Sequence, residues 1–233
     1  MDFISKFPVY WELFYRQITK GAYEGIFIGL KNTIIIAIIG LIIGMLIGSV
    51  LAVLKLTPKK VWWGKVLNAF ADIYVALFRG VPMIVLLLLF KFGLFSAGDP
   101  VVIATIAFGL NSGAYVCEIM RGGILSVDIG QTEAGRALGL NYSQTMMRIV
   151  IPQAIKNIIP TLGNEFISLL KETSVVSFVA VTDIKKGFDQ IAYSTNEFII
   201  PYLMLALVYL VLVLAATGIV KLIERRLRAG DRR

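Results

Sequence analysis

The chain has 233 residues, of which 58% are hydrophobic and only 16% are charged, and its mean hydropathy is +0.80. A soluble domain carries about 25% charged residues, so this composition excludes an ordinary soluble protein and indicates one embedded in a bilayer. The formal net charge of +8 does not indicate nucleic-acid binding, because the Lys and Arg residues lie between and after apolar runs.

Histidine is absent from the sequence, and Cys117 is the only cysteine. Without histidine the chain lacks the commonest metal ligand and the one side chain that titrates unperturbed near neutral pH. A single cysteine excludes an intrachain disulfide, and its apolar neighbourhood indicates a buried thiol without a chemical role. We therefore expect no catalytic residue and no bound metal in this chain.

Residues 1–20 form an N-terminal segment in which charged residues alternate with aromatic ones such as Phe7, Trp11 and Phe14. The segment lacks the long apolar core of a cleavable signal peptide. Aromatic side chains mixed with Lys and Arg are typical of a short helix that lies at the membrane surface. A poorly ordered tail is the alternative.

Residues 21–226 form one membrane domain in which five spans are predicted. A bilayer core of about 30 Å needs roughly 20 helical residues to cross it. Apolar runs of that size predict spans at about residues 23–54, 66–92, 101–120, 153–170 and 198–223. The sequence therefore predicts an all-α integral membrane helical bundle.

Small and helix-breaking residues predict details of these spans. Glycines repeat every four residues in the first span, a spacing that lets two helix backbones approach closely. Gly80 and Pro82 interrupt the second span, and Pro160 and Gly163 bend the fourth. Residues 174–184 are apolar but too short to cross, so we expect a re-entrant or interfacial segment there.

The basic residues predict the orientation of the chain. Most of them follow the first span, surround residues 128–152, or end the chain around the basic tail 227–233. Lys and Arg are enriched in cytoplasmic loops. We therefore expect residues 128–152 and the C-terminus in the cytoplasm, and the N-terminus outside.

Residues 128–152 are a polar loop between apolar spans, and we expect two short helices in it. Asp128 can cap the first helix, with Gln131 at capping-box spacing, and Gly139 can adopt the left-handed conformation that ends it. Ser143 can cap the second helix, and Pro152 should limit it. The result is a compact bent element suited to docking, and an ordinary loop helix is the alternative.

The residue spacing in this loop resembles a known motif. It reads Glu133-Ala134-Gly135, three residues, Gly139, nine residues, and Ile149-Val150-Ile151-Pro152. The cytoplasmic motif of ABC importer permeases is usually written E-A-A, three residues, G, nine residues, I-x-L-P. This chain departs from it at Gly135 and Ile151. The resemblance implies that Glu133, Ala134, Gly135 and Gly139 belong to a coupling helix that fits a groove on a separate ATPase subunit.

Three further stretches, residues 77–82, 115–123 and 164–174, look like the polar amino acid subfamily of these permeases. The likeness covers about residues 20–225. It implies the transmembrane subunit of an ATP-driven importer for polar amino acids in a prokaryotic inner membrane. The implied partners are ATP-binding cassette subunits that hold ATP and Mg, a second permease subunit, identical or related, and an extracytoplasmic solute-binding protein.

The chain lacks the phosphate-binding sequence G-x-x-x-x-G-K-[ST] of nucleotide-hydrolysing proteins. ATP hydrolysis is therefore expected on a partner chain. We expect this chain to be no enzyme and to bind no cofactor directly.

Polar residues at helical spacing in the third and fourth spans predict a substrate path. Asn111, Tyr115, Glu118 and Gly122 recur at intervals of three or four residues, and polar residues on the fourth span do the same. Charges within spans cost about 2.5 to 3.5 kcal/mol each, so they usually face a cavity or a partner. The predicted path comprises Arg79, Tyr115, Glu118, Asn164, Glu165, Ser168 and Glu172.

The charges of this path suggest a substrate with both an amino and a carboxylate group. Glu118 and Glu165 could attract an ammonium or guanidinium group, and Arg79 or Lys171 a carboxylate. The alternative is that the charges, apart from Glu165, pair with one another and only hold helices together. Asp72 and Arg79 are seven residues apart on one helix face, and a helix-locking pair is the preferred interpretation for them.

Two other functions stay open. An ion-coupled secondary carrier would titrate Glu118 or Glu165 while its substrate crosses. A membrane scaffold or sensor would bind a partner through residues 128–152 without transport. The sequence shows no internal repeat, which, with the motif match at residues 133–152, weighs against both.

Overall fold

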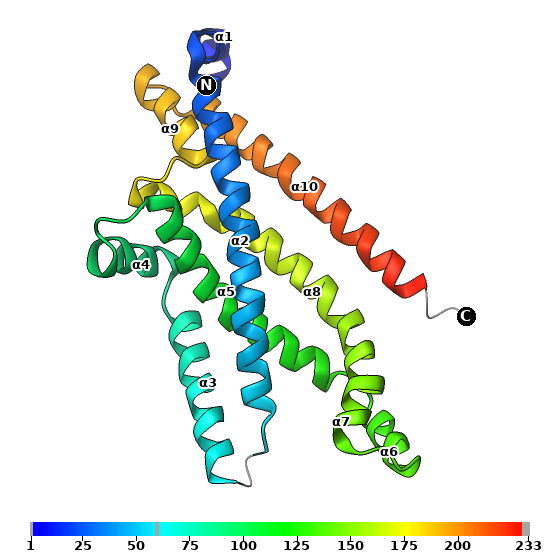
Figure 1. Ribbon diagram of the computed structural model, residues 1–233. Helices are drawn as coiled ribbons and strands as arrows, with labels where there is room; N and C mark the ends of the chain where they lie inside the picture. Colours follow the sequence, from blue (N-terminus) through cyan, green and yellow to red (C-terminus); the bar gives the residue numbers. More distant parts are fainter. Residues whose placement is uncertain (1, 59–60, 230–233) are drawn as a thin grey trace. The chain divides into compact units, whose positions relative to one another are not determined.

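The computed structural model describes residues 2–58 and 61–229, and all regular structure in these two ranges is helical (Figure 1). The prediction of an all-α protein is confirmed. Most of the predicted basic tail lies outside the described residues. The α-helices are α1 (Asp2–Gln17), α2 (Tyr23–Leu56), α3 (Trp62–Gly80), α4 (Met83–Leu88), α5 (Pro100–Leu125), α6 (Ile129–Ala137), α7 (Tyr142–Thr145), α8 (Ile151–Glu172), α9 (Ile184–Thr195) and α10 (Ile199–Ala229). Short helical segments of other types are η1 (Ile18–Ala22), η2 (Leu89–Leu94), η3 (Met146–Val150) and η4 (Thr173–Val179).

Within the described ranges, 3 helices are long and apolar enough to cross a membrane: Lys6–Leu56, Pro100–Leu125 and Ile199–Leu227. Trp62–Gly80 and Met83–Leu94 meet the same criterion as a broken pair, which raises the number to 4. Helix α8 has 22 residues but is less apolar, since it contains charged residues such as Lys156 and Glu165. The count of five spans therefore stays a prediction.

The break in the second predicted span is confirmed. Helix α3 ends at Gly80, Val81 is extended, and Pro82 is the residue before α4. Proline cannot donate the backbone hydrogen bond that would continue α3, and it favours an extended residue before it.

The contacts divide the chain into two compact units. Unit 1 comprises Met1–Ile39, Pro82–Phe108 and Leu169–Ala215, and unit 2 comprises Gly40–Val81, Gly109–Ser168 and Ala216–Arg233. The long helices α2, α5, α8 and α10 each contribute residues to both units.

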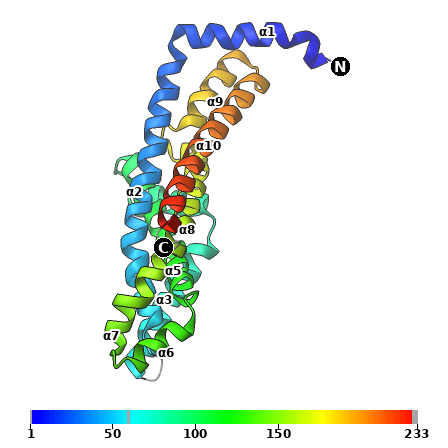
Figure 2. The same ribbon diagram turned by 90° about the vertical axis from the view of Figure 1, so that its right-hand side faces the viewer.

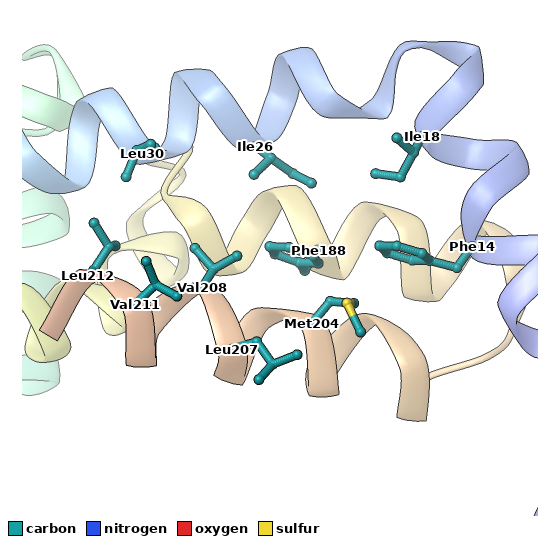
Figure 3. Close-up of a pocket in the computed structure, with 10 residues that line it drawn as sticks. All are labelled: Phe14, Ile18, Ile26, Leu30, Phe188, Met204, Leu207, Val208, Val211 and Leu212. Atoms are coloured by element: carbon teal, nitrogen blue, oxygen red, sulfur yellow. The ribbon is translucent and has the colours of Figure 1, made fainter. Parts of the chain in front are cut away.

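Unit 1 holds the N-terminal helix against α9 and the first part of α10. Gly21 has φ +106, which lets the chain turn sharply between α1 and α2 (Figure 2). Phe14 stacks on Phe188 with ring centroids 6.4 Å apart, and an apolar cavity of about 550 Å³ opens beside them (Figure 3). Trp11 and Tyr15 stay exposed on α1. Residues 2–17 are thus a helix and not a poorly ordered tail.

Unit 2 packs α2 closely on α5 through glycines. A Cβ atom added to Gly44 would lie 2.8 Å from Cβ of Ser112, and one added to Gly48 would lie 2.7 Å from Cβ of Val116. Real side chains do not approach so closely, so both positions require glycine as the helices now pack. The prediction that these glycines serve helix packing is confirmed.

Candidate functional site

The polar loop begins with a capped helix, as predicted. The Asp128 carboxylate accepts a hydrogen bond from the Gly130 N–H (2.7 Å) at the start of α6. Gln131 does not complete a capping box; its side-chain oxygen accepts a hydrogen bond from Gln153 instead (3.1 Å). Gly139 has φ +79 and ends the helix, because this left-handed conformation strains other residues.

The predicted cap of the second helix is wrong. Asn141, not Ser143, caps α7: its side chain accepts from the Gln144 N–H (2.9 Å), and the Gln144 side chain accepts from the Asn141 N–H (3.1 Å). Ser143 lies inside the helix. Asn and Ser are comparably good caps, and the reciprocal bond from a residue three positions later favours Asn141.

The prediction that Pro152 limits the second helix is also wrong. Helix α7 continues through η3 into α8, and Pro152 lies in the first turn of α8. η3 is a π-helical turn, over Met146–Val150, and it comes just before Pro152. A wider turn at this point accommodates a residue that cannot donate to the carbonyl four positions earlier.

Helices α6 and α7 pack on each other at Gly135, which is buried. A Cβ atom added to Gly135 would lie 2.8 Å from Cγ2 of Thr145 and 3.3 Å from Cδ1 of Ile149. The motif that the loop resembles has alanine here. The contact with Thr145 therefore explains why this chain departs from it.

The loop exposes a mixed apolar and acidic surface. Leu138 is 80% exposed and Ile129 is 74% exposed, and the side chains of Tyr142 and Met147 are also largely outside. Glu133 is exposed on the same loop. We call these five residues the loop surface. Exposed apolar groups together on a polar loop are typical of a surface that binds another protein.

The predicted path residue Glu165 meets helix α5 within unit 2. The Ser112 hydroxyl donates a hydrogen bond to Glu165 Oε1 (3.0 Å), and Ser112 is fully buried. The polar stripe predicted on this helix included the neighbouring Asn111 and not Ser112. A single stripe on a helix does not show which adjacent residue faces the partner helix.

Arg79 lies over the ring of Tyr115, with its guanidinium carbon 5.0 Å from the ring centroid. This cation–π contact joins two residues of the predicted path. The predicted pair between Arg79 and Asp72 is wrong, since Asp72 forms its ion pair with Lys55 (2.8 Å). Lys55 is on another helix, so the sequence spacing could not show this partner.

Glu118 is the centre of an ion cluster in unit 2. Its carboxylate lies 2.5 Å from Lys55 Nζ and 2.8 Å from Arg121 Nη2. Lys55 also binds Asp72, so the four charges balance. For Glu118, the structure thus favours the interpretation that the charge holds helices together, as buried charges usually require a partner.

The remaining path residues lie on α8. Asn164 is exposed and Ser168 is half-buried, and both belong to unit 2 with Glu165. Glu172 is exposed and belongs to unit 1 together with Lys171. Unit 2 therefore contains all the predicted path residues except Glu172.

In the described ranges, no group of three or more Asp, Glu and Cys side chains lies close enough together to hold a metal ion.

Comparison with known proteins gives a consistent result. The family described as "Binding-protein-dependent transport system inner membrane component" matches residues 44–229. The chain is similar to the arginine transport system permease protein ArtQ of Bacillus subtilis, with 38% identity over 89% of this chain and 93% of that protein. It is also 38% identical to the putative glutamine transport system permease protein GlnP of Rickettsia bellii, over 88% of this chain and 91% of that protein.

Solved structures show the same likeness. A chain from a crystal structure of an amino acid ABC transporter with histidines aligns with a TM-score of 0.79 and 36% identity, covering 97% of this chain and 99% of that one. A chain of the MetNI methionine ABC transporter aligns with a TM-score of 0.72 at 20% identity, over 85% of this chain and 94% of that one, which supports the fold alone.

Proposed function

Since the chain belongs to the family of binding-protein-dependent transport system inner membrane components, we propose that it carries a polar amino acid across the membrane along α5 and α8. The chain is a transmembrane subunit of an ATP-driven amino acid importer, and separate subunits hydrolyse the ATP. Its own part is to form the path and to couple it to those subunits. It does no covalent chemistry.

The contact between Ser112 and Glu165 is the observation that supports this path most directly. It places a half-buried carboxylate between two helices in an apolar domain. Ser112 donates one hydrogen bond to Glu165 and so orients the group. A carboxylate at this position can attract the ammonium or guanidinium group of a substrate, which favours a basic amino acid.

Arg79 supplies the complementary charge for a substrate carboxylate. Its guanidinium carbon lies 5.0 Å from the centroid of the Tyr115 ring, and a guanidinium group carries five N–H donors that match a carboxylate. Asn164 and Ser168 extend the path along α8, with Glu172 in the last turn of that helix. Glu118 contributes its neutralised ion cluster to the wall.

The loop surface is the proposed contact with the ATPase subunit. Glu133, Ala134, Gly135 and Gly139 occupy the positions of the coupling motif, and α6 and α7 form a compact pair (Figure 1). ATP binding would draw two such subunits together, move the loops and tilt the spans that follow them. A second permease subunit, and an extracytoplasmic solute-binding protein that delivers the amino acid, complete the proposed assembly.

The proposed orientation puts the loop and the C-terminus in the cytoplasm of a prokaryotic cell and the N-terminus outside. Arg136 and Gln190 are both exposed, and they should lie on opposite sides of the membrane. In intact cells, a membrane-impermeant thiol reagent should label Gln190→Cys and spare Arg136→Cys. The reverse labelling would overturn the orientation.

The experiment that tests the function uses the assembled complex in proteoliposomes. ATP hydrolysis is measured with L-arginine, L-histidine or L-glutamine supplied with the binding protein, for wild type, Glu165→Ala and the exposed control Gln190→Ala. Losing a hydrogen bond to a charged group costs about 1.5–3 kcal/mol, so stimulation by L-arginine should fall at least about tenfold in Glu165→Ala only. An unchanged response to L-arginine would remove Glu165 from the path.

A further inference from the structure

Unit 2 contains a second polar feature, a cavity of about 410 Å³ between α5 and α8. Glu118, Gly122 and Ser126 line it from α5 and the chain just after, and Asn157 and Thr161 line it from α8. The predicted substrate path did not include Ser126, Asn157 or Thr161. Ile119 and Gly123 complete the lining, and Ser126, Asn157 and Thr161 are exposed.

The cavity continues the helix faces that carry the path. Glu118 and Gly122 on α5, and Ser126 just after it, follow one another at intervals of four residues. On α8 the same interval links Asn157, Thr161 and Glu165. The two faces meet again where the Asn157 amide donates a hydrogen bond to the Ser126 hydroxyl (2.9 Å). The cavity therefore lies on the loop side of the contact between Ser112 and Glu165.

We propose that this cavity is a second binding site for the transported amino acid, occupied on its way out to the cytoplasm; this proposal rests on the proposed function. Four of the seven residues that line the cavity carry polar side chains, which can form hydrogen bonds with a polar ligand. The Ser126 hydroxyl donates to the Gly123 carbonyl (2.8 Å) and the Thr161 hydroxyl to the Asn157 carbonyl (3.1 Å), so both oxygens can accept from an ammonium group. The Asn157 amide gives one N–H to Ser126 and has a second that can donate to a carboxylate.

The site recognises the zwitterionic backbone of an amino acid and not the charge of its side chain. Its one acidic residue, Glu118, is already neutralised by Lys55 and Arg121. The other polar side chains of the lining are neutral, so they form no ion pair with the ligand. Weak binding that does not depend on the side chain of the substrate suits a site from which the substrate is released.

The cavity is joined directly to the coupling loop. Ser126 lies two residues before the cap Asp128, and Asn157 lies in the second turn of α8 after the loop. The hydrogen bond from Gln153 to Gln131 (3.1 Å) connects the same two segments one turn further on. A displacement of α6 relative to α8 would strain the contacts of Gln131 with Gln153 and of Ser126 with Asn157, and so change the size of the cavity.

Gly122 gives a clean way to fill the cavity. A Cβ atom added there meets nothing within 4 Å, and the same holds for Gly218 on α10. Both are helical glycines of unit 2, so Gly218 is a matched control. The test measures ATP-driven uptake of labelled L-arginine and L-glutamine by the complex in proteoliposomes, for Ala, Val and Leu at each position.

At Gly122 the maximal uptake rate should fall as the side chain grows. At valine it should be about tenfold lower than in wild type, because losing one or two hydrogen bonds to the substrate weakens binding by about that factor. Both amino acids should be affected equally. The ratio of the maximal rate to KM should stay near its wild-type value, because the binding protein and Glu165 act before this site. The Gly218 series should match wild type in every measurement.

A maximal rate that stays flat across the Gly122 series, in a wild type that transports, overturns the second site and leaves the proposed function intact. Failure of the wild type to transport either probe overturns the proposed function and this site with it. Thr161→Val provides a second variant if a Gly122 variant does not assemble. It removes the Thr161 hydroxyl, with its hydrogen bond to the Asn157 carbonyl (3.1 Å), at an exposed position. An undiminished maximal rate there would also overturn the site.

Discussion

At Gly29 in unit 1, α2 passes directly over the backbone of Asp183 and Ile184. A Cβ atom added to Gly29 would overlap the carbonyl group of Asp183, and a backbone group cannot swing aside as a flexible side chain can. The neighbouring Asn32 amide donates a hydrogen bond to the Thr182 carbonyl (2.8 Å). Single residues of α2 thus hold the segment that leads into α9.

Gly29→Ala should lower the stability of the purified subunit by about 1–3 kcal/mol, the usual cost of inserting a methyl group into a packed site. Gly218→Ala is the control, since its Cβ would point into open space. It should be neutral or stabilise by about 0.5–1 kcal/mol, because alanine favours helix. Thermal unfolding in detergent measures both, and equal midpoints for the two variants would contradict the packing argument.

Asp183 is a buried carboxylate with one satisfied oxygen. Its Oδ1 accepts from the Lys186 N–H (2.9 Å) as the cap of α9, whereas Oδ2 is buried without a hydrogen-bond partner among the described residues. The residue lies in the loop before α9, outside the spanning helices. Burial raises the pKa of Asp183 from 3.8 to about 6, although the positive charge of Lys185 opposes the shift.

This raised pKa predicts how stability depends on pH. The folded state binds the proton more tightly than the unfolded state, so the contribution of Asp183 is greatest below pH 4 and is lost as pH rises towards 6. The difference in stability between wild type and Asp183→Asn, which keeps the cap, should change by up to about 3 kcal/mol over that window. A difference that is constant from pH 4 to 7 would contradict it.

At the scale of elements, the coupling loop shows what local sequence predicts and what it does not. The cap at Asp128 and the left-handed turn at Gly139 follow from residue type alone, and both are confirmed. The helix that runs on through Pro152 was missed, because a π-helical turn has no recognised sequence signal. The packing of Gly135 on Thr145 was missed because it joins two helices.

The contact between Gly135 and Thr145 predicts a pair of compensating changes. Gly135→Ala should impair ATP-driven uptake, because its methyl group displaces Thr145 and separates α6 from α7. Adding Thr145→Ala removes the overlapping atoms and should restore part of the uptake. Contacting residues typically show coupling energies of about 0.5–3 kcal/mol. Strictly additive effects of the two changes would show that the contact does not shape the loop.

For the whole molecule, composition sufficed to predict a helical membrane protein, and spacing sufficed to find the motif. Partners across helices could not be predicted: Lys55 binds Asp72 and Glu118, and Ser112 binds Glu165, each from a distant part of the chain. For this reason Glu118, predicted as a residue that attracts substrate, is now interpreted as one that holds helices together. The number of spans stays a prediction, because α8 carries the polar residues that the proposed path needs.

Coupling between the loop surface and ATP-driven transport is the central claim, and Leu138 tests it most directly. It is 80% exposed, so a substitution there should disturb docking and not folding. The measurement is ATP-driven uptake of L-arginine by the complex in proteoliposomes, with Leu138→Glu and the apolar control Leu138→Met. We predict that Leu138→Glu loses uptake and binding of the ATPase subunit while Leu138→Met retains both. Uptake by Leu138→Glu at the wild-type rate, or uptake driven by an ion gradient without ATP, would contradict the account.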